Sequence, residues 1–130
     1  MKNDPCGDES TDWLREARTV LMNLGDQTIA ETGSWNHVIQ HLMLEHQLTL
    51  STAESCTGGF IASQLTDLPG SSGYFLGSVV SYANSVKQNV LGVSLATLQN
   101  YGAVSPQCAE EMLSGVLRLI GSNIGVAVTG

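Results

Sequence analysis

The stretch LTLSTAESCTGGF, residues 48–60, decides the class of fold. Its first half, LTLSTA, is short and rich in β-branched residues, and this pattern predicts a strand. The pair Gly58-Gly59 then predicts a tight turn, and Phe60 to Leu65 predicts a short helix. A strand that enters a helix through a turn of small residues is typical of α/β proteins, whose ligands bind where strands end.

Further strands and helices alternate after this turn. FLGSVVSY, residues 75–82, and IGVAV, residues 124–128, predict two more strands. Short helices are predicted from Asn84 or Ser85 to near Gly92, and over residues 94–101. The alternation predicts a layered α/β fold in which a sheet carries flanking helices.

The most strongly marked helix follows Ser105. Serine suits the N-cap, Pro106 suits the first helical position, and the acidic pair at 110–111 suits the positive end of the helix dipole. Cys108 lies beside the buried face of this helix, and a packing role is expected for it. The predicted buried stripe consists of Ala109, Met112, Leu113, Val116, Leu117 and Ile120.

Composition and charge argue against several classes of function. The 130 residues favour one folded domain, and a hydrophobic content of 42% is ordinary for a globular protein. The net charge is −7 and lysine and arginine do not cluster, which argues against binding to nucleic acid or to an anionic membrane surface. No apolar stretch approaches the roughly 18 residues that cross a bilayer. The polar N-terminus MKNDPCGDES has no hydrophobic signal core, so we expect a cytoplasmic protein.

Residues 1–33 are predicted to form a partly helical N-terminal extension ahead of a domain at residues 34–130. A helix is predicted after Thr11, and residues 1–9 are predicted to be disordered. The apolar residues of this helix that share one face are Trp13, Leu14, Ala17, Val20 and Leu21. A second helix is predicted to begin after Ser34.

Two spacings raise the question of a metal or redox site. His37 and His41 are four residues apart with Glu45 one turn further on, as metal ligands on a helix would be. They lie opposite the apolar stripe of that helix, so a solvent-facing role is the better explanation. The cysteines at 6, 56 and 108 form no C-x-x-C pair and are expected to be free thiols. We therefore predict neither a metal nor a cofactor.

The turn at residues 55–59 is the best candidate for catalytic chemistry. Backbone N–H groups in a turn of small residues approach a ligand closely, and a nucleophile placed there shares them as an oxyanion hole. Ser55, Cys56 and Thr57 are the candidate nucleophiles. The alternative is a strand–helix turn whose small residues serve packing alone, since short glycine-containing motifs are common.

A serine nucleophile needs a base, and the histidines at 37, 41 and 46 all lie near the predicted N-terminal helix. Lysine also serves serine as a base, and Lys87 is the only lysine after residue 2. Tyr82, five residues earlier, is placed to relay or orient a proton. The alternatives are a solvated helix lysine and a half-buried strand tyrosine.

A second turn, at residues 70–73, carries Ser71 and Ser72 between glycines. Either serine could bind a phosphate group or shape the loop, and on the residues alone loop shaping is the better explanation. Both possibilities stay open at this point.

Four blocks of the sequence together resemble the CinA C-terminal domain family. They are AESCTGGF (53–60), GSSGYFLGSVVSYANSVKQNVLGV (70–93), YGAVSPQCAEEM (101–112) and IGVAVTG (124–130). Their order and spacing are typical of that family, whose best-known members are nicotinamide-nucleotide amidohydrolases. The resemblance runs from about Trp35 to Gly130, and residues 1–33 lie outside it.

The resemblance implies hydrolysis of the carboxamide of nicotinamide mononucleotide to nicotinic acid mononucleotide and ammonia, without a metal or cofactor. It implies Ser55 as the nucleophile with Lys87 and Tyr82 as its partners. With so few basic residues, the nucleotide phosphate would be held mainly by backbone N–H and hydroxyl groups. The expected substrate-binding residues are Thr57, Gly58, Gly59, Ser72 and Thr129.

The family continues past the threonine-glycine of the last block into a glycine- and proline-containing loop, more strand and a final helix. This sequence ends at Thr129-Gly130, so the resemblance implies a domain that lacks its last part. An exposed sheet edge there predicts a homo-oligomer. The alternative function is a truncated, non-catalytic relative that binds a nucleotide or assembles with a partner chain.

Overall fold

The computed structural model describes residues 35–130, and the chain divides after His46 into two units that are considered separately. In the first unit, helix α2 covers Trp35–Glu45, in agreement with the helix expected after Ser34. The helix predicted after Thr11 lies outside the described residues. The division into an extension at 1–33 and a domain at 34–130 stays a prediction.

The second unit is built on a sheet of parallel strands in the order β2-β1-β3. Strand β1 covers Leu50–Glu54, β2 covers Phe75–Val80 and β3 covers Ile124–Val128. Glu54, the last residue of β1, pairs with Val80 on one side and Val128 on the other. Because the three strands end together, the residues that follow them lie at one edge of the sheet.

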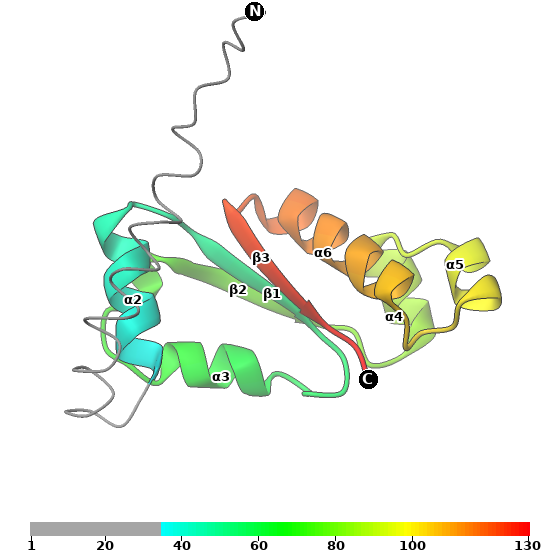
Figure 1. The fold of residues 1–130 in the computed structure, drawn as a ribbon, viewed down its shortest axis with the longest axis horizontal. Coiled ribbons are helices and arrows are strands. Elements are labelled where there is room, and N and C mark those ends of the chain that lie inside the picture. Colours follow the sequence, from blue (N-terminus) through cyan, green and yellow to red (C-terminus); the bar gives the residue numbers. More distant parts are fainter. Residues whose placement is uncertain (1–34) are drawn as a thin grey trace, which may run out of the picture. The chain divides into compact units, whose positions relative to one another are not determined.

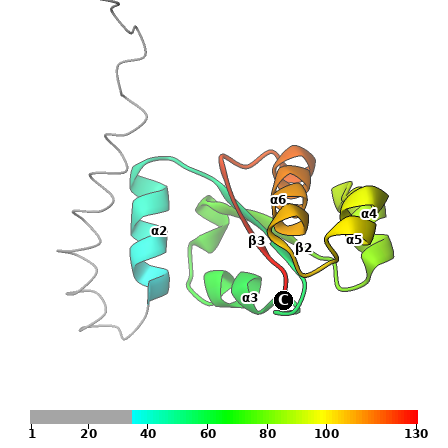
Figure 2. The same cartoon turned by 45° about the vertical axis from the view of Figure 1, so that its right-hand side comes forward.

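Helices cover both faces of this sheet, as Figures 1 and 2 show, and the predicted α/β layers are confirmed. Helix α3 (Phe60–Thr66) lies on one face and α6 (Pro106–Ile120) on the other, with α4 (Asn84–Leu91) and α5 (Leu95–Asn100) beside α6. A 3-10 turn, η1 (Ser71–Gly73), leads into β2. The core on the α6 face consists of Ala53, Leu91, Val93, Cys108, Met112 and Val116.

Local signals explain where α6 begins and ends. The Ser105 hydroxyl accepts a hydrogen bond from the Cys108 N–H, and Gly121 closes the helix in the left-handed conformation. The acidic pair was predicted for the positive end of the helix, but the first turn contains no acidic residue. Glu111 instead accepts hydrogen bonds from the Ser94 N–H and the Thr97 hydroxyl, which ties α6 to the start of α5.

Gly115 marks where α4 and α6 cross. A Cβ at this position would collide with the main chain of Leu91, at the end of α4. The buried stripe predicted for α6 did not include Gly115, although this residue is buried. The packing role expected for Cys108 is confirmed, because its side chain is completely buried in the core.

Candidate active site

Ser55 lies at the edge of the sheet where the three strands end. Its N–H donates to the Val128 carbonyl at 3.0 Å, so the backbone at Ser55 is held against β3. The residue is only 7% exposed. The Ser81 N–H donates to the Glu54 carbonyl at 2.7 Å, which fixes the chain leaving β2 next to the chain leaving β1. The parallel register therefore brings residues 55, 81 and 129 to one region.

Lys87 reaches this region from the second turn of α4 and is 1% exposed. Its Nζ donates to the Ser55 Oγ at 2.9 Å and to the Ser81 carbonyl at 2.6 Å. A third hydrogen bond, at 3.2 Å, goes to the Tyr82 carbonyl. All three hydrogens of an ammonium thus have acceptors. The interpretation of Lys87 as a solvated helix lysine is wrong, because α4 turns this residue toward the core beside Leu91.

The same geometry suits a neutral amine. A neutral Lys87 would keep two N–H bonds to the carbonyls of Ser81 and Tyr82, and its lone pair would face the Ser55 hydroxyl. The Ser55–Lys87 pair can therefore pass a proton in either direction without moving its heavy atoms. Such a pair is the arrangement that activates a serine nucleophile without histidine.

The turn after Ser55 is shaped by two glycines in the left-handed region. Gly58 has φ +59° and Gly59 has φ +98°. The Gly58 N–H donates to the Ser55 carbonyl at 3.0 Å, which closes the turn. Within residues 35–130 the N–H groups of Cys56 and Thr57, which directly follow Ser55, have no hydrogen-bond acceptor.

Three of the remaining predicted site residues lie at the same edge of the sheet as Ser55, and Ser72 does not. Tyr82 meets Lys87 through its backbone carbonyl, while its side chain is 75% exposed. Thr57 follows in the turn, and Thr129 follows β3 at the same edge of the sheet. Ser72 precedes β2 and so lies at the opposite, amino-terminal edge. The structure does not bring Ser72 to Ser55, and its role in binding stays a prediction.

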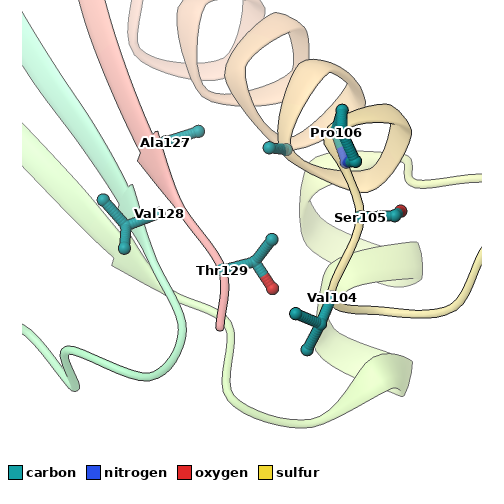
Figure 3. Close-up of a pocket in the computed structure, with 7 residues that line it drawn as sticks. Val104, Ser105, Pro106, Ala127, Val128 and Thr129 are labelled. Atoms are coloured by element: carbon teal, nitrogen blue, oxygen red, sulfur yellow. The ribbon is translucent and has the colours of Figure 1, made fainter.

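A hollow of about 390 Å³ opens between the end of β3 and the start of α6, as seen in Figure 3. The Thr129 hydroxyl donates to the Ala103 carbonyl at 2.7 Å, and the Ser105 hydroxyl donates to the Gly102 carbonyl at 2.9 Å. Both hydroxyl hydrogens are used, so the hollow offers a mostly apolar wall with hydroxyl oxygens as acceptors. It is lined by Val104, Ser105, Pro106, Ala109, Ala127, Val128 and Thr129.

Two groups at the site were not found from the sequence. The Ser81 carbonyl is the closest partner of Lys87, and a backbone acceptor leaves no signal in side-chain patterns. Glu54 is fully buried directly before Ser55. An acidic residue inside a strand that is otherwise apolar or hydroxyl-bearing was the available signal for it.

No group of three or more histidine, cysteine or acidic residues arranged to hold a metal occurs in the described part of the chain. His41 instead forms an ion pair with Glu45 at 3.1 Å, and both side chains are about half exposed. Within residues 35–130 no helix is long and apolar enough to cross a membrane.

Comparison with known proteins gives the family. The model of the CinA C-terminal domain matches residues 31–130. A CinA-like protein of Pseudothermotoga lettingae is 54% identical over 93 residues, which is 72% of this chain and 23% of that protein. The competence/damage inducible protein CihA of Agrobacterium tumefaciens is 44% identical, with a TM-score of 0.72 over 73% of this chain and 58% of that chain.

A second solved structure, the competence damage-inducible protein A of Klebsiella pneumoniae, is 37% identical with a TM-score of 0.72. The match covers 73% of this chain and 59% of the Klebsiella pneumoniae chain. The chain thus spans under a quarter of the length of the curated relative from Pseudothermotoga lettingae. The match of the family model over residues 31–130 and these likenesses in sequence and structure show that the chain belongs to the CinA C-terminal domain family.

Proposed function

We propose that this chain is a linear-amide hydrolase that converts nicotinamide mononucleotide to nicotinic acid mononucleotide and ammonia. The observation that carries the proposal is the buried hydrogen bond of 2.9 Å between Lys87 Nζ and Ser55 Oγ. Family membership supports the hydrolase class, and the resemblance of the four sequence blocks supports the substrate.

The first step is attack by Ser55 on the carboxamide carbon. The hydroxyl proton passes to the neutral amine of Lys87 as the bond from Oγ to carbon forms. The carbonyls of Ser81 and Tyr82 accept hydrogen bonds from the resulting ammonium, so the transferred charge stays solvated inside the protein.

The turn after Ser55 stabilises the negative oxygen that develops on the substrate. The N–H groups of Cys56 and Thr57 are the donors, because they have no acceptor within residues 35–130 and follow the nucleophile directly. Donors that are already in place need no reorganisation during the reaction, which is the main source of such stabilisation.

The second half of the reaction returns the enzyme to its starting state. The Lys87 ammonium protonates the leaving nitrogen, ammonia departs, and an ester remains on Ser55. Water then attacks the ester while Lys87 accepts its proton, and Lys87 returns that proton to Ser55 Oγ as the bond from Oγ to carbon breaks. The carboxylic acid product ionises to the pyridine carboxylate, and the released ammonia takes up that proton. Water is the only co-reactant, so atoms and charge balance.

The substrate lies along the edge of the sheet in this proposal. The pyridine ring packs against the mostly apolar hollow that Thr129 and Val104 border. The phosphate binds to N–H and hydroxyl groups, since Lys87 is occupied by Ser55 and the chain carries few basic side chains. The Tyr82 phenol, which is exposed in the free chain, contacts the bound substrate and assists proton transfer.

The test is ammonia release from nicotinamide mononucleotide by the wild-type chain and by Ser55→Ala. Ser114→Ala, which changes an exposed serine on α6, is the matched control. We expect Ser55→Ala to lose turnover by roughly 10³-fold or more, and the control to keep it. A folded wild-type chain without turnover would support the alternative function, a non-catalytic relative that binds a nucleotide or assembles with a partner chain.

A further inference from the structure

The Glu54 carboxylate is the most heavily engaged buried charge near the site. Its side chain is 0% exposed. Oε1 accepts from the Ile61 N–H at 2.9 Å, and Oε2 accepts from the Ala62 N–H at 2.9 Å. Oε2 also accepts hydrogen bonds from the Thr52 hydroxyl at 3.2 Å and from the Ser78 hydroxyl at 3.3 Å. Each carboxylate oxygen is therefore bonded to the first turn of α3.

The two N–H bonds to Glu54 join the two ends of the segment that carries Ser55. Residue 54 ends β1, and the two N–H donors lie in the first turn of α3, so the carboxylate joins both ends of the turn at 55–59. A turn tied at both ends holds its own N–H groups and the Ser55 hydroxyl in one geometry. Two glycines at positive φ within the turn make it readily deformable when that tie is absent.

The backbone of Glu54 is also linked to Lys87, through two hydrogen bonds that meet at Ser81. The Glu54 carbonyl accepts from the Ser81 N–H at 2.7 Å, and the Ser81 carbonyl in turn accepts from Lys87 Nζ at 2.6 Å. Both members of the Ser55–Lys87 pair are thus attached to residue 54, one through the covalent chain and one through Ser81.

The charge of Glu54 is maintained by its surroundings. Burial works to raise the pKa of its carboxyl, but the N–H bonds from Ala62 and Ile61, together with the Thr52 hydroxyl, lower the pKa below its ordinary value. The group is a carboxylate at neutral pH, which is the form that accepts two N–H bonds at once.

We propose that Glu54 is a positioning residue that sets the turn carrying Ser55 and the oxyanion donors. It does not contact the reacting atoms. The inference rests on the proposed function, because positioning has meaning only if Ser55 is the nucleophile. A misplacement of about 1 Å in such a site costs on the order of 100-fold in rate.

Glu54→Gln tests this with little change of shape. The amide keeps one oxygen but turns an NH₂ group toward the second N–H donor, so one of the two bonds to Ile61 and Ala62 is lost. Glu111→Gln is the matched control. Glu111 also accepts a backbone N–H and two hydroxyls at the start of a helix, from Ser94 and Thr97, but none of these groups belongs to the turn at 55–59.

Three quantities are measured on the full chain: kcat and KM for ammonia release, the rate at which a fluorophosphonate probe labels Ser55, and the free energy of unfolding. The probe forms a bond from Oγ to phosphorus and releases fluoride, and mass spectrometry locates it. We expect Glu54→Gln to lower kcat and the labelling rate together by roughly tenfold to 100-fold, with a smaller change in KM. Glu111→Gln should keep both rates even if it loses stability.

Equal rates in folded Glu54→Gln and wild type would overturn the inference, and so would an equal fall in Glu111→Gln. If Glu54→Gln fails to fold, Ser78→Ala replaces it, since it removes one hydroxyl bond to Oε2 and leaves both N–H bonds. The labelling rate should then fall roughly twofold to tenfold, and an unchanged rate would overturn the inference.

Labelling of Ser55 by the probe distinguishes a failure of the proposed function from a failure of the proposal on Glu54. A wild-type chain that labels at Ser55 but releases no ammonia refutes the proposed substrate and leaves Glu54 to be decided by the labelling rates. A wild-type chain in which the probe leaves Ser55 unlabelled overturns the inference, because a positioned Ser55–Lys87 pair is its premise.

Discussion

At the scale of single residues, the hydrogen bonds of Lys87 separate main-chain from side-chain roles. Lys87 contacts the backbone carbonyls of Ser81 and Tyr82, so these two positions act on it whatever their side chains are. Among residues 35–130, only Ser55 forms a hydrogen bond with Lys87 through its side chain. A substitution at Tyr82 therefore changes the phenol without removing the bond to Lys87.

Tyr82→Phe isolates the phenol for this reason. We expect kcat/KM for nicotinamide mononucleotide to fall roughly 100-fold, the low end of what a positioned proton donor contributes. Tyr101→Phe, another exposed tyrosine, is the control and should leave kcat/KM unchanged. A wild-type value in Tyr82→Phe would remove the phenol from the mechanism and leave the carbonyl as the contribution of this residue.

How far the sequence predicts the site differs from residue to residue. The position of Ser55 in a turn after a strand was predicted correctly, because the strand and the glycine pair give local signals for a turn. The burial of Lys87 could not be read from α4, whose neighbouring residues are mostly polar, and its contact with Ser55 spans 32 residues of sequence. The position of Ser72 could not be predicted either. Ser72 precedes β2, and only the direction of β2 in the sheet reveals that this residue lies at the edge opposite Ser55.

At the scale of elements, the crossing of α4 and α6 depends on a side chain that is absent. Gly115→Ala would place a methyl group against the Leu91 main chain. Because backbone cannot move aside as a flexible side chain does, we expect the free energy of unfolding to fall by about 1–3 kcal/mol in a urea titration. Ser114→Ala, the exposed neighbour, should change it little. Equal stability of both variants would show that the helices separate without cost.

The two carboxylates that join elements predict how stability depends on acid. Hydrogen bonds from Thr97 and Ser94 lower the pKa of Glu111, as those from α3 lower the pKa of Glu54 against its burial. A lowered pKa in the folded state means that the stabilisation is complete above the ordinary carboxyl pKa, near 4.5. It is lost as pH falls from there through the lowered value.

We therefore expect Glu54→Gln and Glu111→Gln each to flatten the loss of stability below pH 4.5, measured as Tm against pH. Glu110→Gln, an exposed acid beside Glu111, is the control. If Tm fell as steeply below pH 4.5 in both variants as in wild type, the lowered pKa values of Glu54 and Glu111 would be contradicted.

The elements themselves were largely predictable because their ends carry local chemistry. Ser105 and Pro106 fixed the start of α6, Gly121 fixed its end, and Gly92 fixed the end of α4. The buried faces were less predictable, because contact with a neighbouring element decides them. Gly115 has no side chain to enter a hydrophobic pattern, yet a Cβ there would collide with the main chain at the end of α4.

At the scale of the whole molecule, the sheet has open edges in the described part of the chain. The order β2-β1-β3 leaves the outer side of β3 without a neighbouring strand among residues 35–130. Val126 on this strand is exposed. Unpaired strand edges pair readily with other chains, so the homo-oligomer expected from the sequence stays our prediction.

Light scattering coupled to size exclusion tests this edge. We expect the chain to associate in a concentration-dependent manner, and Val126→Lys to shift it toward the monomer, since a charged side chain on an edge strand opposes pairing. Leu119→Lys changes an exposed leucine on α6 and serves as the control. Monomers at every concentration, or equal dissociation by both variants, would contradict pairing through β3.

The most direct test of the central claim is the product balance from nicotinamide mononucleotide, measured for the wild-type chain and for Lys87→Met. Methionine keeps much of the buried volume and removes the amine that bonds Ser55. We predict equimolar ammonia and nicotinic acid mononucleotide from wild type, and roughly 10³-fold less of both from folded Lys87→Met. A folded wild-type chain that yields neither product would contradict the proposed reaction, and a Lys87→Met variant as fast as wild type would contradict the Ser55–Lys87 pair as the catalytic centre.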